Sequence, residues 1–468
     1  MKKLIFAVFA IAIFSFGCNE ESKENGKKIA VKRPNIIFIL TDDQRWDALG
    51  YVGNAIIKTP NMDALAKDGL YFKNAFVTTP ICAVSRATLL TGLYERTHDF
   101  NFGKPNLKDT YLYESYPYLL KKSGYRTGLI GKFGVKVNQG ITDSLFDTFT
   151  TTRWPYLKEV DGEEIHLADI NGNHAINFIK QEDSAPFCLS LSFWSPHADD
   201  GAEDQYFWPK YVDSLYRDIK IPEPATANPA FFDSLPEFMK QSMNRKRWYW
   251  RYDTPEKFQE MVKGYYRMIS AVDSVVGRIR TTLEEEGLDK NTIIVFMGDN
   301  GYYLGDRGFA GKWLMHEQSL RVPLMIYDPR QPESAQGKTI EEMVLNLDIA
   351  PTLLELAGVA TPERYQGKSL ASFYGSGAES WRTSAFFEHQ HNKEPVLLPK
   401  TEGYRDETYK FIRYEASPEF LELYNLKEDI NETNNLAFVE KYSDRVDRYA
   451  QKCDSIVNEL MADRISEQ

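Results

Sequence analysis

Two pairs of polar residues in this sequence have the composition of a metal site. Asp42 and Asp43 follow one short apolar run after a single threonine, and Asp299 and Asn300 directly follow another. Carboxylate and amide oxygens suit Ca²⁺ or Mg²⁺ better than zinc, which favours His and Cys. Adjacent carboxylates repel each other unless a cation neutralises them, so the pairing favours a bound ion. The alternative is that both pairs are surface turn residues, as most such dipeptides are.

A second candidate group surrounds Cys82, which opens the segment Cys-Ala-Val-Ser-Arg-Ala-Thr-Leu-Leu-Thr-Gly. If a helix begins near Cys82, its unpaired N–H groups and its dipole favour an anion beside that residue. Arg86 then lies one turn further on the same face, where its guanidinium can hold an oxyanion through two hydrogen bonds. Lys132, His197 and Lys312 can add positive charge. Taken alone, such a cysteine is more often a buried thiol, so both interpretations stay open.

Apolar runs of strand length precede most of these polar groups, and helix-like stretches lie between them. The runs are 35–40, 126–130, 187–194, 293–298 and 322–327, and the helix-like stretches include 59–69, 114–123 and 258–286. Such runs suit strands that are covered on both faces. The alternation predicts an α/β fold with a doubly wound sheet, and such sheets bind ligands outside the carboxyl ends of the strands. Four strands should therefore deliver Asp42, Lys132, His197 and Asp299 to one edge.

The pattern changes after about residue 375. Residues 408–414 alternate like a half-exposed antiparallel strand, 420–424 form a second one, and 436–461 read as a long amphipathic helix. We therefore predict a catalytic domain over 33–375 and a small α+β subdomain over 376–468, made of an antiparallel sheet and a helix.

The first residues read as a targeting segment. Two lysines precede a 13-residue apolar run, and Gly17-Cys18 follows it. The run is shorter than the roughly 20 residues that span a bilayer, so 1–17 is predicted to be a signal peptide. Cys18 resembles the lipidated cysteine of a bacterial lipobox, and the charged segment 18–32 reads as a tether. The prediction is an exported lipoprotein that is anchored to the outer membrane, at the cell surface or in the periplasm; a plain cleaved signal peptide is the alternative.

Composition limits the remaining classes. The chain has 468 residues, a formal net charge of −11 and 43% hydrophobic residues, which describes a globular protein and argues against broad nucleic-acid binding. Its 4 cysteines give no disulfide framework. No membrane contact is expected beyond a lipid anchor.

The segment that begins at Cys82 resembles the activation signature of the type I, formylglycine-dependent sulfatases of the alkaline phosphatase superfamily. Other parts of the chain match that family's motifs in order, namely 35–43, 124–132, 195–197, 298–301 and 311–323, with 409–413 and 422–426 in the tail. The resemblance spans roughly 33–440. It implies an alkaline phosphatase-like fold, in which helices sandwich a large mixed, mostly parallel sheet.

The resemblance also implies a mechanism. A formylglycine-generating enzyme would oxidise Cys82 to formylglycine (3-oxoalanine), whose hydrated form attacks the sulfur of a sulfate ester. Arg86 would support this nucleophile, Lys132 and Lys312 would bind sulfate, and His197 would protonate the leaving oxygen. A divalent cation, Ca²⁺ in most relatives and otherwise Mg²⁺, would be held by Asp42, Asp43, Cys82, Asp299 and Asn300.

Two positions depart from the family pattern. Val84 stands where the signature has Pro or Ala, which bears on maturation of Cys82. Gly134 stands where the family motif that matches 124–132 continues with a His, which in the family is assigned to breakdown of the covalent intermediate. His98 is a candidate to replace it.

An exported sulfatase suggests a sulfated oligosaccharide or polysaccharide, such as an algal one, as substrate. His98, Arg307 and His316 are predicted to contact it. The segment 245–252 interleaves cations with aromatic rings, which could stack on sugars or simply pack on the domain. Two alternatives stay open: a phosphoesterase of the same superfamily, and a catalytically silent glycan-binding lipoprotein.

Overall fold

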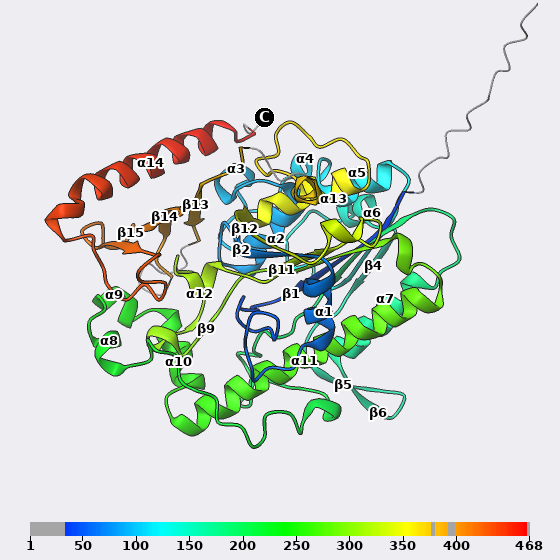
Figure 1. Ribbon diagram of the computed structural model, residues 1–468, viewed down its shortest axis with the longest axis horizontal. Coiled ribbons are helices and arrows are strands. Elements are labelled where there is room, and N and C mark those ends of the chain that lie inside the picture. Colours follow the sequence, from blue (N-terminus) through cyan, green and yellow to red (C-terminus); the bar gives the residue numbers. More distant parts are fainter. Residues whose placement is uncertain (1–32, 376–379, 392–397, 466–468) are drawn as a thin grey trace, which may run out of the picture. The chain divides into compact units, whose positions relative to one another are not determined.

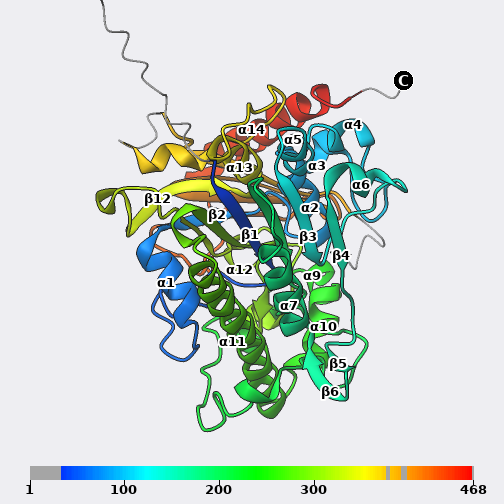
Figure 2. The same ribbon diagram turned by 90° about the vertical axis from the view of Figure 1, so that its right-hand side faces the viewer.

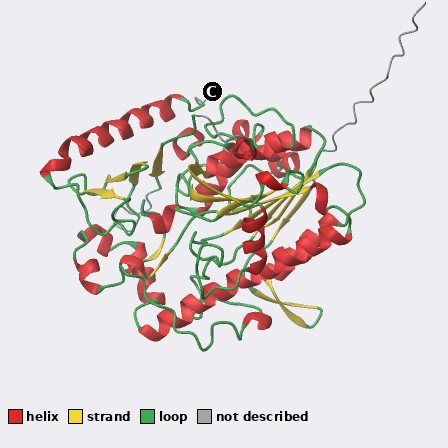
Figure 3. Cartoon of the chain, in the orientation of Figure 1, coloured by secondary structure: helices red, strands yellow, loops and turns green. Residues whose placement is uncertain are grey.

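Eight strands form the central sheet of the computed structural model, which describes residues 33–375, 380–391 and 398–465 (Figures 1 and 3). Their order across the sheet is β12-β2-β11-β8-β1-β7-β3-β4. Strand β11 runs antiparallel to both neighbours, and all other neighbouring pairs are parallel. The predicted mixed, mostly parallel sheet is therefore confirmed. The strands are β1 Asn35–Thr41, β2 Leu70–Phe76, β3 Arg126–Gly131, β4 Thr148–Thr151, β7 Phe187–Ser192, β8 Thr292–Gly298, β11 Leu324–Tyr327 and β12 Lys338–Leu345.

Helices cover both faces of this sheet (Figure 2). Along β1, Ile36, Phe38 and Leu40 belong to one hydrophobic core, whereas Ile37 and Ile39 belong to the other. The first core is closed by α2 Cys82–Thr91, α5 Tyr116–Lys122 and α13 Ile349–Leu356; the second by α1 Pro60–Asp68, α7 Leu167–Ile179 and α11 Pro255–Glu285. This burial on two sides is why the sequence shows continuous apolar runs instead of alternation.

Shorter elements connect these layers. They are α3 Glu95–His98, α4 Asp109–Leu112, α6 Ile141–Leu145, α8 Pro229–Asp233, α9 Glu237–Lys240, α10 Met243–Arg251 and α12 Glu317–Leu320, with the hairpins β5 Leu157–Val160/β6 Glu163–His166 and β9 Tyr303–Leu304/β10 Ala310–Gly311.

The C-terminal part forms a separate antiparallel sheet with α14 Ser443–Ala462 packed on one face (Figure 1). Its strands, in spatial order, are β13 Ser384–His389, β14 Thr401–Asp406, β15 Tyr409–Tyr414 and β16 Leu421–Asn425. The predicted subdomain is confirmed, but the prediction that its helix begins at residue 436 is wrong. The Asn435 side chain accepts backbone N–H groups of Leu423 and Ala437 and so holds the chain in a turn against β16.

The chain divides into two units, residues 1–32 and residues 33–468. The signal peptide predicted for 1–17, the tether predicted for 18–32 and the lipidation of Cys18 all lie outside the described residues. The second unit contains both the region predicted as catalytic and the C-terminal sheet. Among the described residues, no helix has the length and apolar character needed to cross a bilayer.

Candidate active site

The two pairs of predicted metal ligands meet because β1 and β8 are parallel neighbours. Thr41 is in register with Gly298, so the residues that follow each strand lie side by side. The backbone N–H of Asp43 donates to Asp299 Oδ1 at 3.2 Å, and the N–H of Asp299 donates to the carbonyl of Thr41 at 2.9 Å. Asp42, Asp43, Asp299 and Asn300 are all buried. The predicted convergence at the carboxyl edge is observed.

Several oxygens of this cluster have no hydrogen-bond partner within the described part of the chain. They are Asp42 Oδ1, Asp43 Oδ2 and Asn300 Oδ1. The Asn300 amide nitrogen donates to Asp43 Oδ1 at 2.6 Å, which leaves its own oxygen free to bind an ion. Buried oxygens without donors are costly unless a cation neutralises them. These hard oxygen ligands therefore fit Ca²⁺ or Mg²⁺.

Three cationic side chains surround the same carboxylates. Lys132 donates to Asp42, Lys312 donates to Asp43, and Arg86 Nε donates to Asp299 Oδ2 at 2.8 Å. All three cations are buried. Three carboxylates and three cations thus form one buried network, whose lysines could turn to a bound oxyanion when a metal ion takes the carboxylates.

The charges of this network shift the pKa values of its members. Burial raises the pKa of Asp42, but the charges of Lys132, His197, Lys312 and Arg86 outweigh burial and lower it. Burial and the charge of Asp42 raise the pKa of Asp299 to about 6. The carboxylates therefore differ: the surrounding cations favour the charged form of Asp42, whereas burial and the charge of Asp42 disfavour the charged form of Asp299.

Cys82 opens helix α2, as predicted. Ile81 is extended, with φ −152°, and the helix runs from Cys82 to Thr91. Cys82 is partly exposed, and Arg86 lies one turn on. Burial lowers the pKa of Lys312, but the charges of Asp43, Cys82 and Asp42 outweigh it and raise the pKa. The same thiol charge acts on Lys132 and Arg86, so the sulfur lies within electrostatic reach of all three cations.

His197 reaches the cluster from the end of β7. Its Nε2 lies 3.6 Å from Asp43 Oδ2, and its Nδ1 lies 2.6 Å from the carbonyl of Ala198. An Nδ1 proton donated to that carbonyl leaves Nε2 directed at the carboxylates. Burial lowers the pKa of His197, although the charges of Asp43 and Asp42 oppose this shift.

Gly134, at the position where the family has a His, lies against Arg86. Its φ is +76°, and a Cβ built on it would lie 2.8 Å from Arg86 Cδ. The backbone at this position thus favours glycine, and the arginine occupies the space that a side chain would need.

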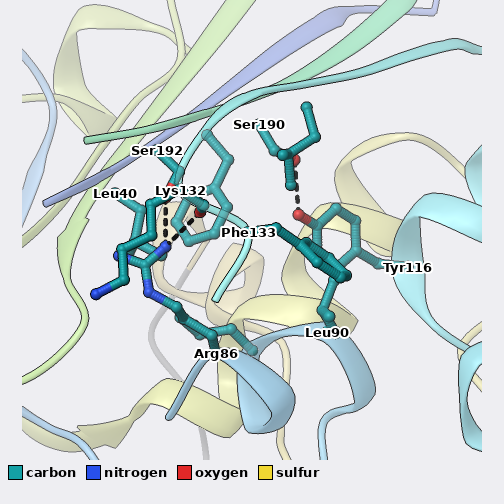
Figure 4. A pocket seen from close by; sticks show the side chains of 11 residues that line it. Leu40, Arg86, Leu90, Tyr116, Lys132, Phe133, Ser190 and Ser192 are labelled. Atoms are coloured by element: carbon teal, nitrogen blue, oxygen red, sulfur yellow. Dashed lines mark hydrogen bonds between the residues drawn. The ribbon is translucent and has the colours of Figure 1, made fainter. Parts of the chain in front are cut away.

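Behind Arg86 and Lys132 lies a small cavity, whose other walls include Leu40, Leu90 and Tyr116 (Figure 4). Arg86 donates there to Ser192 and, at 2.7 Å, to the carbonyl of Lys132. The cavity measures about 30 Å³, whereas ligand pockets have about 300–1,000 Å³. It has no room for a sugar, so the substrate side of the cluster lies elsewhere.

Three predicted substrate contacts are engaged away from the carboxylate cluster. His98 Nε2 lies 3.3 Å from the Thr88 hydroxyl, and burial lowers its pKa to about 3. Arg307 donates to the carbonyls of Asn431 and Glu432. His316 lies between Tyr303 and Glu422, at 2.6 and 2.8 Å. These buried contacts join helices, strands and loops to one another, so we leave all three residues, and His98 as a replacement for the missing His, out of the site.

Sequence reasoning missed several residues that complete the cluster. The Tyr265 hydroxyl donates to the Asp43 carbonyl at 2.7 Å, yet nothing in the sequence of α11 distinguishes it from other buried tyrosines. The Trp194 ring lies 4.5 Å from Lys132 Nζ, and Asp200 binds two arginines of α10. The last two are near His197 in sequence, which is the signal that could have identified them.

The fold and the cluster define a hydrolase of the alkaline phosphatase-like class, and comparison with known proteins specifies it further. A sulfatase family model matches residues 34–359, and a model of the N-sulphoglucosamine sulphohydrolase C-terminal region matches 305–459. The chain is 28% identical to an N-acetylglucosamine-6-O-sulfatase of Bacteroides thetaiotaomicron, over 88% of this chain and 84% of that one. It is 29% identical to an ulvan-active sulfatase of Formosa agariphila, over 77% of this chain and 69% of that one.

Solved structures agree with this assignment. A structure of a protein in complex with its substrate D-glucosamine-2-N,6-O-disulfate has a TM-score of 0.77 and 25% identity, and the match covers 92% of this chain and 98% of that one. The chain therefore belongs to the sulfatase family, and its activity is that of a sulfuric ester hydrolase.

Proposed function

We propose that this protein hydrolyses sulfate esters of a sulfated carbohydrate, with residue 82 as formylglycine and a divalent cation in the carboxylate cluster. The observation that carries the proposal is a convergence at one edge of the sheet. The free oxygens of Asp42, Asp43 and Asn300 lie there with three buried cations, and Cys82, at the start of α2, acts electrostatically on all three cations. A sulfate ester presents an anion with an electrophilic sulfur, and this arrangement supplies both positive charge and a nucleophile for it.

Each residue has a role that follows from its position. Residue 82, once oxidised, supplies the attacking oxygen at the start of α2. Arg86 is fixed by Asp299 and by the Lys132 carbonyl, so it can hold that oxygen in place. Lys132 and Lys312 bind the sulfate oxygens. His197, in its doubly protonated form, which the charges of Asp43 and Asp42 favour, delivers the Nε2 proton to the departing alcohol. A cation bound by Asp42, Asp43, Asp299, Asn300 and residue 82 would supply Lewis-acid stabilisation of the developing negative charge.

The substrate class follows from two lines of support. The named relatives include a sulfatase of N-acetylglucosamine 6-sulfate and a sulfatase active on ulvan. The N-terminal sequence favours an exported lipoprotein, which meets polysaccharides outside the cell. We therefore propose a sulfated glycan, of algal or other polysaccharide origin, for this chain. A formylglycine-generating enzyme is the partner needed for maturation, and the anchor at Cys18 would place the protein at the outer membrane.

Mass spectrometry of the peptide that contains residue 82 tests the proposal most directly. The expected result, after expression with a maturation enzyme, is the aldehyde in place of the Cys82 thiol, together with release of inorganic sulfate from sulfated oligosaccharides. Val84, which departs from the family signature, is buried against Ile81 and Trp313. The same spectrum shows whether a valine at this position permits maturation of Cys82. An unmodified thiol and no sulfate release would favour the silent glycan-binding protein. Release of phosphate but not of sulfate from matched esters would favour the phosphoesterase.

A further inference from the structure

Helix α10 connects two parts of the active site that are far apart in sequence. At one end, the Asn244 amide donates to the Lys312 carbonyl at 2.8 Å. Further along, Arg247 and Arg251 both bind Asp200, three residues after His197. The helix thus lies between the segment that carries Lys312 and the segment that carries His197. Its face with Asn244, Arg247 and Arg251 follows the i, i+3, i+7 spacing of one helical side.

Arg247 is held on its other side by Trp313. Its guanidinium lies 4.8 Å from the centre of that indole ring, a cation–π contact. The backbone N–H of Trp313 donates to the Pro80 carbonyl at 3.2 Å, and the Trp313 ring packs on Ile81, the residue before Cys82. Arg247 therefore contacts Trp313, which follows Lys312 in the chain and packs near Cys82, and Asp200, three residues after His197.

The charges around Arg247 are not balanced. The ion pairs of the described residues give Arg247 and Arg251 one carboxylate between them, that of Asp200. Arg251 is fully buried, and its Nε and Nη1 have no partner in the described part of the chain; Arg247 Nε has none either. The Arg247 side chain is 13% exposed, whereas that of Arg251 is fully buried, so of the two only Arg247 meets solvent. One positive charge beside the site thus remains available to an anion.

We propose that Arg247 binds a second anionic group of the substrate, a carboxylate or another sulfate on the same or the adjacent sugar. This inference rests on the proposed function and adds to it: the substrate is a glycan with more than one anionic group. Asp200 and Trp313 hold the guanidinium in place, and a guanidinium presents paired N–H donors to such an oxyanion. Lys132 and Lys312 bind the sulfate that is removed; Arg247 selects the sugar that carries it.

Binding to a non-reacting variant tests this without dependence on turnover. In a Cys82→Ala background, we measure by calorimetry the Kd of N-acetylglucosamine-6-O-sulfate, of glucosamine-2-N,6-O-disulfate and of a disaccharide that links glucuronate to the monosulfated sugar. At least one of the two doubly anionic ligands should bind about tenfold more tightly than the monosulfated sugar, since a hydrogen-bonded charge pair has that effect. Which one does so distinguishes a sulfate from a carboxylate.

Arg247→Gln should remove this preference while binding of the monosulfated sugar changes less than about twofold. Lys246→Gln is the matched control, because it removes one positive charge from the neighbouring, exposed position of the same helix and should keep the preference. Equal affinities for all three ligands in the parent would overturn the inference, as would a preference that survives Arg247→Gln or is lost equally in Lys246→Gln. Sulfate release is measured separately on the matured protein that retains residue 82. If that protein releases no sulfate while the binding preference still depends on Arg247, the result counts against the proposed function alone.

Discussion

At the residue scale, the candidate site is a balance of buried charges. Asp42, Asp43 and Asp299 face Arg86, Lys132 and Lys312, and each cation binds a carboxylate. The meeting of Asp42 and Asp43 with Asp299 and Asn300 could be predicted, because each pair comes at the end of an apolar run. Their pairings could not, because nothing in the sequence shows that Arg86 reaches Asp299 and Lys312 reaches Asp43.

Metal binding should be visible as thermal stabilisation. Ca²⁺ at about 100 times its Kd should add about 2.7 kcal/mol to the free energy of unfolding, because only the folded chain assembles the oxygen ligands. Asp299→Asn should abolish this shift and reduce sulfate release by about a thousandfold or more, while Asp447→Asn, at an exposed position, should change neither. Differential scanning fluorimetry with and without chelator measures the shift. An equal Ca²⁺ response in Asp299→Asn would remove that residue from the ligand set.

Gly134 allows a prediction about the missing histidine. Gly134→His restores the family pattern but should lower activity, because its Cβ would displace Arg86, which lies 2.8 Å away. Gly134→Ala should show the same loss and destabilise the fold by about 1–3 kcal/mol. Gly140→Ala is the matched control: Gly140 has φ +85°, and no atom of the described residues lies within 4 Å of a Cβ built on it, so the variant carries backbone strain without the contact. Increased sulfate release by Gly134→His would contradict this account.

At the element scale, the strands that carry the site could be predicted from the sequence. The edge strand β12 and the strands β13 and β14 of the C-terminal sheet could not. Strands β1, β3, β7 and β8 are continuous apolar runs with helices between them, so their parallel arrangement follows from the sequence. Strand β12 was missed because it begins Lys-Thr-Ile-Glu-Glu-Met, which is not a continuous apolar run. As the edge strand of the sheet it has exposed positions, where charged residues are tolerated. Similarly, β13 and β14 carry Glu388, Glu402 and Arg405, whose charged side chains form ion pairs in the interior that a charged sequence does not predict.

The ion pairs between β15 and α12 should be strongly stabilising as a group. Lys410 is fully buried and binds Glu317 at 2.6 Å and Glu432 at 2.7 Å. Lys410→Met leaves both carboxylates without this partner and should lower the free energy of unfolding by about 3–5 kcal/mol. Lys427→Met, an exposed position, should change it by less than about 0.5 kcal/mol. Urea denaturation of both variants measures the difference; equal effects would show that Lys410 adds no net stability.

At the scale of the whole molecule, the C-terminal sheet helps to position the active site. The chain that carries Lys312 continues into His316 and Glu317, and these two residues bind Glu422 of β16 and Lys410 of β15. The sequence predicted His316 as a substrate contact because it is close to Lys312. The structure instead places it between the two sheets, a long-range contact that no local pattern reveals.

A buried carboxyl pair between α3 and β13 should make stability fall as pH rises. Burial and the charge of Glu388 raise the pKa of Glu95 to about 8, and burial raises that of Glu388 to about 7. Between the unfolded pKa near 4.5 and these values, the folded state retains protons that the unfolded state has lost. Stability is therefore greatest below that range and declines through it, by at most about 1.4 kcal/mol per pH unit for each group.

Replacing Glu95 with its neutral isostere isolates this effect, because the Asn101 amide that donates to Glu95 at 2.9 Å can still donate to a glutamine oxygen. Glu95→Gln should flatten the decline between pH 5 and pH 8, while the exposed Glu182→Gln leaves it unchanged. Melting temperatures across that range, in the absence of metal, measure the slope. A parent protein whose stability rises across this range would contradict the assignment of a retained proton to this pair, since ionised carboxylates would then be favoured between α3 and β13.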